Sequence, residues 1–231
     1  MQYRYIQWDK NEKCAVFFQN ANYNPVAILS SNLLNKTDIL EFFEYYFLLI
    51  CGESMGISRW KLDTLMLIGT YNIDKLDDTL SLNTPNPTYI SEYINVIGQL
   101  FLAGYIDFGS YCDNDDSDKI DYPTNLSYYK EDKYQAWIHF RDNYFYISRF
   151  NRDLDEPETT DENGYSLILD DASWDTPKYW SQYNIWVART PKGDEYFEKV
   201  LAPRFYNKYK DLEVEIDSKG NVIRWIGRIN R

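Results

Sequence analysis

The hydrophobic and polar positions at the two ends of the chain alternate in short runs, which predict β-hairpins. Near the start, apolar runs at 3–8 and 14–18 are separated by five polar residues, a spacing typical of two strands joined by a short loop. Near the end, the runs 212–216 and 222–226 flank a segment with Gly220, which supplies the turn chemistry of a second hairpin.

Between the hairpins the apolar positions change to helical spacing. Apolar residues recur on one helical face from Ile39 to Ile50, with Thr37 as the expected N-cap and Gly52 as the stop. A second helix is predicted over 60–68, because Trp60, Leu65, Met66 and Ile68 are followed by a glycine.

A third helix is predicted after a turn-rich stretch. Thr88 or Ser91 is expected to cap it, and its apolar face continues through Phe101. Gly104 then suits the left-handed stop that ends many helices, and 105–108 has the apolar character of an emerging strand.

The segment 111–183 combines aromatic and acidic residues. Two acidic loops, 113–118 and 153–164, border the aromatic runs 136–140 and 144–147. Three polar residues separate these runs, which indicates a third hairpin. We therefore expect this segment to be a β-rich acidic insert.

Two short motifs resemble parts of bacterial winged-helix proteins. The sequence Leu100-Phe101-Leu102-Ala103-Gly104-Tyr105-Ile106 resembles the end of the third helix where it leads into the wing. The stretch 186–198, a strand running into Thr190-Pro191-Lys192-Gly193, resembles the other edge of that wing. The chain departs from the family in the roughly 75 residues that interrupt the wing, and in a third helix without Lys or Arg. Because a helix that reads DNA carries such donors, DNA reading is not expected here.

Together these patterns predict an α+β fold with a helical, winged-helix-like core. The expected parts are an N-terminal hairpin at 1–36, a core formed by 37–110 plus 184–206, an acidic β-rich insert at 111–183, and a C-terminal hairpin at 207–231.

The net charge of −12 is confined to one stretch of the sequence. Between Asp107 and Asp175 there are 18 acidic and 6 basic residues, whereas the rest of the chain carries 18 of each. Charge of one sign in one region repels itself, and a basic partner relieves that repulsion. A pI near 4.6 also disfavours nucleic acid, whose phosphates attract basic surfaces. We therefore expect a basic protein partner and no direct nucleic-acid binding.

The predicted partner-binding residues are carboxylates of the two acidic loops and two tryptophans that follow them. They are Asp113, Asp115, Asp116, Asp118, Asp155, Glu156, Glu158, Asp161, Glu162, Trp174 and Trp180. Tryptophans ringed by charge are typical of interface hot spots. The alternative for the two indoles is that they fill the seam between insert and core.

Candidate catalytic and metal-binding residues each have a structural alternative. His139 is a potential general base, but no nucleophile motif accompanies it, which favours a structural histidine within an aromatic strand. The pairs Glu156 with Glu158 and Asp170 with Asp171 suit carboxylate catalysis, yet such pairs are common in acidic chains.

A calcium loop starting at Asp113 fails on two required residues. Asp118 stands where the loop needs glycine, and Thr124 stands where it needs a bidentate glutamate.

Composition excludes several further classes of protein and site. Cys14, Cys51 and Cys112 lie far apart without a CxxC pair, which excludes a zinc framework or a disulfide scaffold. No glycine-rich nucleotide motif is present, so we expect neither an enzyme nor a cofactor. The longest apolar run is far shorter than the ~20 residues of a membrane span, and we expect a cytoplasmic protein without a membrane partner.

The leading hypothesis is a protein-binding inhibitor whose acidic insert docks a basic partner. An immunity protein neutralising a bacterial nuclease toxin and a nucleic-acid-mimicking phage inhibitor both fit this description. The alternative is a winged-helix transcription regulator whose insert dimerises or senses a ligand. Its basic face would comprise Arg189, Lys192, Lys199, Arg204, Lys208 and Lys210.

Overall fold

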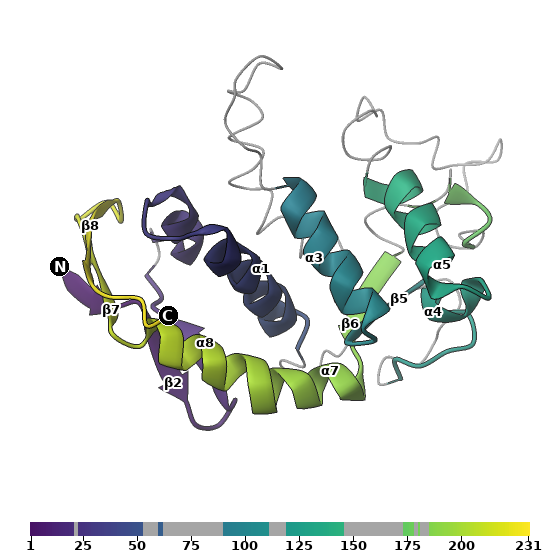
Figure 1. Cartoon of the computed structure of the whole chain (residues 1–231), viewed down its shortest axis with the longest axis horizontal. Helices are drawn as coiled ribbons and strands as arrows, with labels where there is room; N and C mark the ends of the chain where they lie inside the picture. Colours follow the sequence, from purple (N-terminus) through teal and green to yellow (C-terminus); the bar gives the residue numbers. More distant parts are fainter. Residues whose placement is uncertain are drawn as a thin grey trace, which may run out of the picture. The chain divides into compact units, whose positions relative to one another are not determined.

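A computed structural model describes residues 1–20, 23–52, 60–61, 90–110, 119–145, 173–177, 180 and 185–231. Helices and antiparallel strands alternate along the chain, so the predicted α+β class is confirmed (Figure 1). The chain divides into two compact units, Met1–Tyr46 with Glu195–Arg231 and Phe47–Asp194. We call them the first unit and the second unit. The predicted N- and C-terminal hairpins, which were expected to be separate parts, both belong to the first unit.

The first unit combines two small antiparallel sheets with helices. Its elements are β1 (Gln2–Arg4), β2 (Ile6–Asp9), β3 (Cys14–Phe17), the 3-10 turn η1 (Pro25–Ser30), most of α1 (Lys36–Ile50), the π-helical turn η5 (Phe197–Leu201), α8 (Ala202–Tyr209), β7 (Leu212–Ile216) and β8 (Val222–Gly227).

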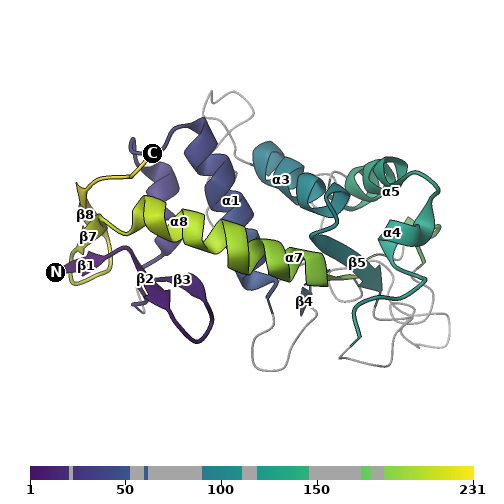
Figure 2. The ribbon, with the colours of Figure 1, turned by 60° about the horizontal axis from the view of Figure 1, so that its bottom comes forward.

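Both predicted terminal hairpins are confirmed. Strand β2 pairs with β3, with Ile6 opposite Phe17, and Figure 2 shows this hairpin beside α8. Strand β7 pairs with β8, and β1 joins the other edge of β7 in the order β1-β7-β8. The turn between β7 and β8 uses Gly220 at a φ of 85°, which a residue with a side chain rarely adopts.

Stacked aromatic rings form the centre of the first unit. Tyr45 of α1 and Phe205 of α8 stack with their ring centroids 3.8 Å apart, and Phe17 of β3 packs edge-on against Tyr45 at 6.1 Å. The buried Tyr45 hydroxyl accepts a hydrogen bond from the Ala15 N–H at 2.9 Å and donates one to the Ala15 carbonyl at 2.6 Å. This tyrosine therefore joins the apolar core to the backbone of β3.

The first long helix is capped two residues earlier than predicted, by Asn35 and not by Thr37. The Asn35 side-chain oxygen accepts from the Asp38 N–H at 2.9 Å, and an Asp38 carboxylate oxygen accepts from the Asn35 N–H at 3.0 Å. This reciprocal pair satisfies two N–H groups that a helix start leaves open. The prediction of Thr37 as the N-cap is wrong, because Thr37 lies inside α1; the predicted end before Gly52 is confirmed.

The second unit packs helices on a three-stranded antiparallel sheet. Its elements are β4 (Trp60–Lys61), α3 (Ile90–Leu102), β5 (Ile106–Ser110), α4 (Leu126–Tyr129), α5 (Lys133–Phe140), the π-helical turn η3 (Arg141–Phe145), β6 (Ile185–Arg189) and the start of α7 (Pro191–Tyr196). The strand order is β4-β6-β5, and both Figure 1 and Figure 2 show α3 and α5 near β5.

Strands β5 and β6 join two segments that lie far apart in the sequence. Ile106 lies opposite Arg189, and Ser110 lies opposite Ile185. The helix over α3 and the left-handed Gly104, at a φ of 76°, are confirmed. The two segments that carry the winged-helix resemblance are therefore neighbours in one sheet, while the winged-helix assignment itself stays a prediction.

Two sequence-based predictions in the second unit are wrong. Trp60 and Lys61 form strand β4 beside β6, where a helix was expected; the rest of that predicted helix lies outside the described residues. The segment 136–140 belongs to α5, not to a hairpin. The Asp132 carboxylate accepts a hydrogen bond from the Tyr134 N–H at 2.9 Å and so caps this helix.

The described part of the insert is helical, because its aromatic residues are buried at helical spacing. Trp137, Phe140 and Tyr144 follow one another at intervals of three and four residues. The predicted strand 144–147 begins within η3, the continuation of α5, and Tyr146 and Ile147 lie outside the described residues. Among the helices that the structure describes, none has the length and apolar character needed to span a membrane.

Candidate functional site

Phe140 and three aromatic rings packed around it hold the region of interest in the second unit together. The Phe140 ring lies 4.8 Å from Phe108 of β5, 5.7 Å from Trp174 and 5.5 Å from Trp180, measured between centroids. The two indoles lie 5.6 Å apart. Trp174 and Trp180 are thereby packed against α5, and through Phe140 against β5.

The structure places both predicted tryptophan anchors in the interior. Trp174 is 7% exposed and Trp180 is 2% exposed. The Trp174 indole N–H donates to the Thr124 carbonyl at 2.7 Å, and that of Trp180 donates to the Ser173 carbonyl at 2.7 Å. Buried rings whose polar atoms are satisfied correspond to the alternative, in which the indoles fill a seam.

His139 fastens the same segment to α5. Its Nε2 lies 2.8 Å from the Trp174 carbonyl oxygen, which can only accept, so Nε2 carries the proton. Nδ1 is then left as an acceptor and faces the Asn143 side-chain amide at 3.4 Å. The ring also meets Trp180 edge-on at 5.7 Å. These contacts support the predicted structural role, although the histidine lies in a helix and not in a strand.

Helix α4 is fixed to β5 by a buried carboxylate. Asp107 of β5 accepts hydrogen bonds from the Ser127 hydroxyl at 2.5 Å, the Ser127 N–H at 3.3 Å and the Asn125 amide at 3.2 Å. Burial raises the pKa of Asp107, although the hydrogen bonds from Ser127, Phe108 and Asn125 act in the opposite direction. Since the carboxylate stabilises the first turn of α4, the two tyrosines that follow in this helix have a defined position.

Two neighbouring tyrosines of α4 bind carboxylates that lie shortly after two acidic segments of the sequence. We define these segments as 111–118, with four acidic residues and no basic ones, and 146–172, with eight acidic and two basic residues. Tyr128 donates to the Asp121 carboxylate at 2.9 Å, and Tyr129 donates to the Asp175 carboxylate at 2.6 Å. Asp121 and Asp175 each come three residues after one of these segments, so α4 is where both segments rejoin the described fold.

The carboxylates of Asp121 and Asp175 keep their negative charge when they accept these two hydrogen bonds. The bond to Asp121 raises the pKa of Tyr128, and burial together with the bond to Asp175 raises the pKa of Tyr129. Both phenols therefore stay protonated at neutral pH. Because a phenol is a neutral donor, it orients a carboxylate without cancelling its charge.

The part of the chain that the structure describes is electrically balanced. It carries 19 acidic and 19 basic residues, so the whole net charge of −12 falls on residues outside it. The imbalance also follows the division into units. The first unit has 11 acidic and 12 basic residues, whereas the second has 25 acidic and 12 basic residues.

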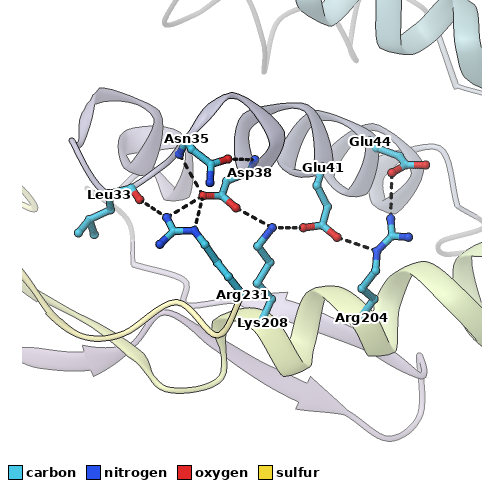
Figure 3. A network of polar contacts seen from close by, with 8 residues as sticks. All are labelled: Leu33, Asn35, Asp38, Glu41, Glu44, Arg204, Lys208 and Arg231. Atoms are coloured by element: carbon cyan, nitrogen blue, oxygen red, sulfur yellow. Dashed lines mark hydrogen bonds and ion pairs between the residues drawn. The ribbon is translucent and has the colours of Figure 1, made fainter.

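Charges in the first unit are paired in a network between two helices and one residue after β8. Figure 3 shows its members, Asp38, Glu41 and Glu44 of α1, Arg204 and Lys208 of α8, and Arg231, together with Leu33 and Asn35. Arg204 pairs with Glu41 at 2.6 Å and with Glu44 at 3.2 Å, and Lys208 also contacts Glu41. Three acids and three bases thus neutralise one another.

Asp38 has the most enclosed carboxylate of this network. It pairs with Lys208 at 2.7 Å and with Arg231 at 2.8 Å. Burial alone would raise the pKa of Asp38, but hydrogen bonds from Arg231, Lys208 and Asn35 outweigh it and lower the pKa below its ordinary value. The carboxylate is therefore held in its charged form.

The basic face expected for a transcription regulator is largely engaged within the fold. Arg189 pairs with Asp194 at 2.9 Å and Lys199 with Glu195 at 2.8 Å, while Arg204 and Lys208 belong to the network above. Lys192 donates to the Ala103 carbonyl, and Lys210 donates to the Asn207 side chain. Four of the six bases are therefore in ion pairs, whereas Lys192 and Lys210 contact neutral acceptors that leave their charge in place.

The nine predicted acidic contact residues lie outside the described residues. They are Asp113, Asp115, Asp116, Asp118, Asp155, Glu156, Glu158, Asp161 and Glu162. The failed calcium loop and the carboxylate pairs at 156/158 and 170/171 begin in the same segments. The sequence analysis missed Tyr128, Tyr129, Asp121 and Asp175; the run Asn125-Leu126-Ser127 before the tyrosines, typical of a helix start, was the available signal.

Comparison with protein-family models, with curated proteins and with solved structures found no match for this chain. Its function is therefore argued from its own residues and their geometry.

Proposed function

We propose that the protein binds a basic protein, and that its two acidic segments supply most of the charge for that contact. The observation that carries this proposal is the balanced scaffold. All of the net charge of −12 falls outside the described residues, and 12 acidic against 2 basic residues of that remainder lie in segments 111–118 and 146–172. An excess of charge of one sign favours a partner of the opposite sign.

An inhibitor of a nuclease or another nucleic-acid-processing enzyme is the best fit to this electrostatic pattern. The phosphate-binding surface of such an enzyme is basic, and an acidic protein covers it in place of nucleic acid. Complementary charge raises association rates towards ~10⁸ to 10⁹ M⁻¹ s⁻¹ at low salt. Fast capture suits an immunity protein, which must reach a toxin before the toxin reaches DNA or RNA.

Direct DNA binding by a winged-helix regulator has less support from the same residues. The helix α3 contains no Lys or Arg, and all five residues of β5 are buried. Four of the six bases expected to form its DNA-binding face are in ion pairs within the fold. This alternative predicts a salt-sensitive gel shift with the DNA upstream of its own gene.

The test is an affinity capture followed by a charge comparison. The tagged protein is used to isolate partners, and the dissociation constant of each basic candidate is measured for the wild type and for the variant D113N/D115N/D116N. The control variant D74N/D77N/D78N removes the same number of charges from a part of the second unit outside the acidic segments.

The proposal predicts that the first variant weakens binding at least tenfold and the control much less. Two findings would contradict it. One is equal weakening by both variants, and the other is a partner whose affinity does not change with salt between 50 and 300 mM.

A further inference from the structure

Two exposed tyrosines stand out on the described surface of the second unit. Tyr128 of α4 is 58% exposed and Tyr134 of α5 is 52% exposed, and no other large apolar side chain within 91–110, 119–145, 173–177, 180 and 185–194 is as open to solvent. The other aromatic residues of these two helices, among them Trp137 and Phe140, are buried or half-buried. Neither ring is needed to fill the core, so packing does not explain why an aromatic residue stands at these two exposed positions.

One carboxylate bonds the Tyr128 hydroxyl, and two more shortly precede Tyr134 in the chain, at Glu131 and Asp132. Asp121 accepts the Tyr128 hydroxyl hydrogen bond at 2.9 Å, and Asp132 caps α5 through the Tyr134 N–H at 2.9 Å. Asp121, Glu131 and Asp132 are all exposed. These exposed carboxylates attract cations, and the three lysines of the same stretch lie over other rings, those of Tyr122, Tyr129 and Phe101.

Lysines of the chain itself show that such rings accept a cation. Lys130 Nζ lies 3.9 Å from the ring centroid of Tyr129, and Lys119 Nζ lies 4.8 Å from that of Tyr122. Both distances are within the range of a cation–π contact. Within the described part of the chain, no cation lies over the rings of Tyr128 or Tyr134.

We propose that Tyr128, Tyr134, Asp121 and Asp132 form a surface that receives arginine side chains of the basic protein partner. This inference rests on the proposed function and names the contact residues within the described fold. A guanidinium is planar, so it stacks on a tyrosine ring while donating two hydrogen bonds to a neighbouring carboxylate. Lysine offers a point charge without that planar face, and arginine is therefore the expected ligand.

The location of this surface agrees with the charge of the acidic segments. Asp121 follows the first segment by three residues, and Asp175, which accepts from Tyr129, follows the second. A partner attracted by both segments therefore meets α4, the helix at which both rejoin the fold. The aromatic contact would supply the short-range specificity that long-range charge lacks.

The experiment compares two fluorescein-labelled peptides, nona-arginine and nona-lysine, by fluorescence anisotropy at 100 mM salt. We expect the full-length wild type to bind nona-arginine more tightly than nona-lysine. The variant Y128L/Y134L should bind nona-arginine about fivefold to twentyfold more weakly and lose its preference for arginine. The variant Y128F/Y134F keeps both rings and should retain most of that preference.

The outcomes separate this inference from the proposed function. If Y128L/Y134L keeps the wild-type affinity and preference, the tyrosine surface is not the arginine site, whatever the acidic segments do. If D113N/D115N/D116N binds both peptides as tightly as the wild type, the proposed function is contradicted instead. Circular dichroism verifies the fold of each variant. Should the double variant unfold, Y134L alone decides, because the Tyr134 side chain makes no hydrogen bond within the described residues.

Discussion

Replacing Asp38 with asparagine should destabilise the protein in a pH-dependent way. The Asp38 carboxylate forms ion pairs with Lys208 and Arg231, and it also accepts a hydrogen bond from the Asn35 N–H (Figure 3). An amide of the same shape can still accept from Asn35. It places a neutral N–H₂ group against a lysine or an arginine, which removes the attraction.

The size of the stability loss in D38N follows from how deeply Lys208 and Arg231 are buried. Removing one member of a buried ion pair costs about 3 to 5 kcal/mol. Here the Lys208 side chain is 12% exposed and keeps its contact with Glu41, and the Arg231 side chain is 50% exposed. Since solvent screens the second pair and Glu41 compensates for the first, we expect a loss of roughly 2 to 3 kcal/mol for D38N at pH 7.

The pH dependence has a defined sign. The pKa of Asp38 is lower in the folded protein than in the unfolded chain, so its charged form stabilises the fold above the unfolded value near ~4. This contribution disappears as the pH falls through the folded pKa. The difference between wild type and D38N should therefore be constant from pH 7 down to about pH 5 and should shrink below about pH 4.

Urea unfolding followed by circular dichroism measures this difference. The matched control is E12Q, which removes one charge from an exposed position of the first unit and should change stability by less than ~0.5 kcal/mol. A D38N penalty that stays the same at pH 3 as at pH 7 would refute the electrostatic explanation. A penalty no larger than that of E12Q would refute the network's contribution altogether.

Three further substitutions test the packing. Y45F should cost roughly 2 kcal/mol in urea unfolding, because it leaves the buried N–H and carbonyl of Ala15 without the tyrosine hydroxyl. G193A should lower the melting temperature markedly, since an added Cβ would overlap the Tyr105 carbonyl oxygen; a melting temperature within one degree of wild type would contradict this. W180A should lower the free energy of unfolding by about 3 to 5 kcal/mol and reduce the near-ultraviolet circular dichroism signal. Both effects are expected of a buried ring and not of a surface anchor.

The elements that the sequence predicted correctly have patterns with a single interpretation. The helix α3 shows an apolar face followed by Gly104, and strand β7 shows strict alternation before a glycine turn. Local chemistry alone decides such elements. The pairing of β5 with β6 was less accessible, because 74 residues separate Ser110 from Ile185.

The error at α5 has a physical cause. The dense aromatic run around Trp137 and Phe140 fits a strand by composition, since aromatic residues favour sheets. Burial at positions 137, 140 and 144 instead follows helical spacing, and the Asp132 cap fixes the start. Composition alone left open whether this run forms a strand or a helix, and tertiary packing on β5 favours the helix.

At the candidate site too, features local to the sequence could be predicted, whereas contacts between distant residues could not. Sequence located the acidic segments because charge is visible without structure. It did not reveal that Trp174 and Trp180 are buried, or that Tyr128 and Tyr129 bind carboxylates three residues beyond the two segments. These contacts join residues up to 46 positions apart and require the fold.

The central claim is that the excess acidic charge of the second unit docks a basic protein. The most direct measurement is the association rate of the captured basic partner, by stopped-flow, for wild type and for a variant with all nine predicted contact acids changed to amides, between 50 and 300 mM salt. The account predicts that the wild-type rate falls at least tenfold with rising salt and that the amide variant is slow at every salt concentration. A rate that is independent of salt and equal in both proteins would contradict it.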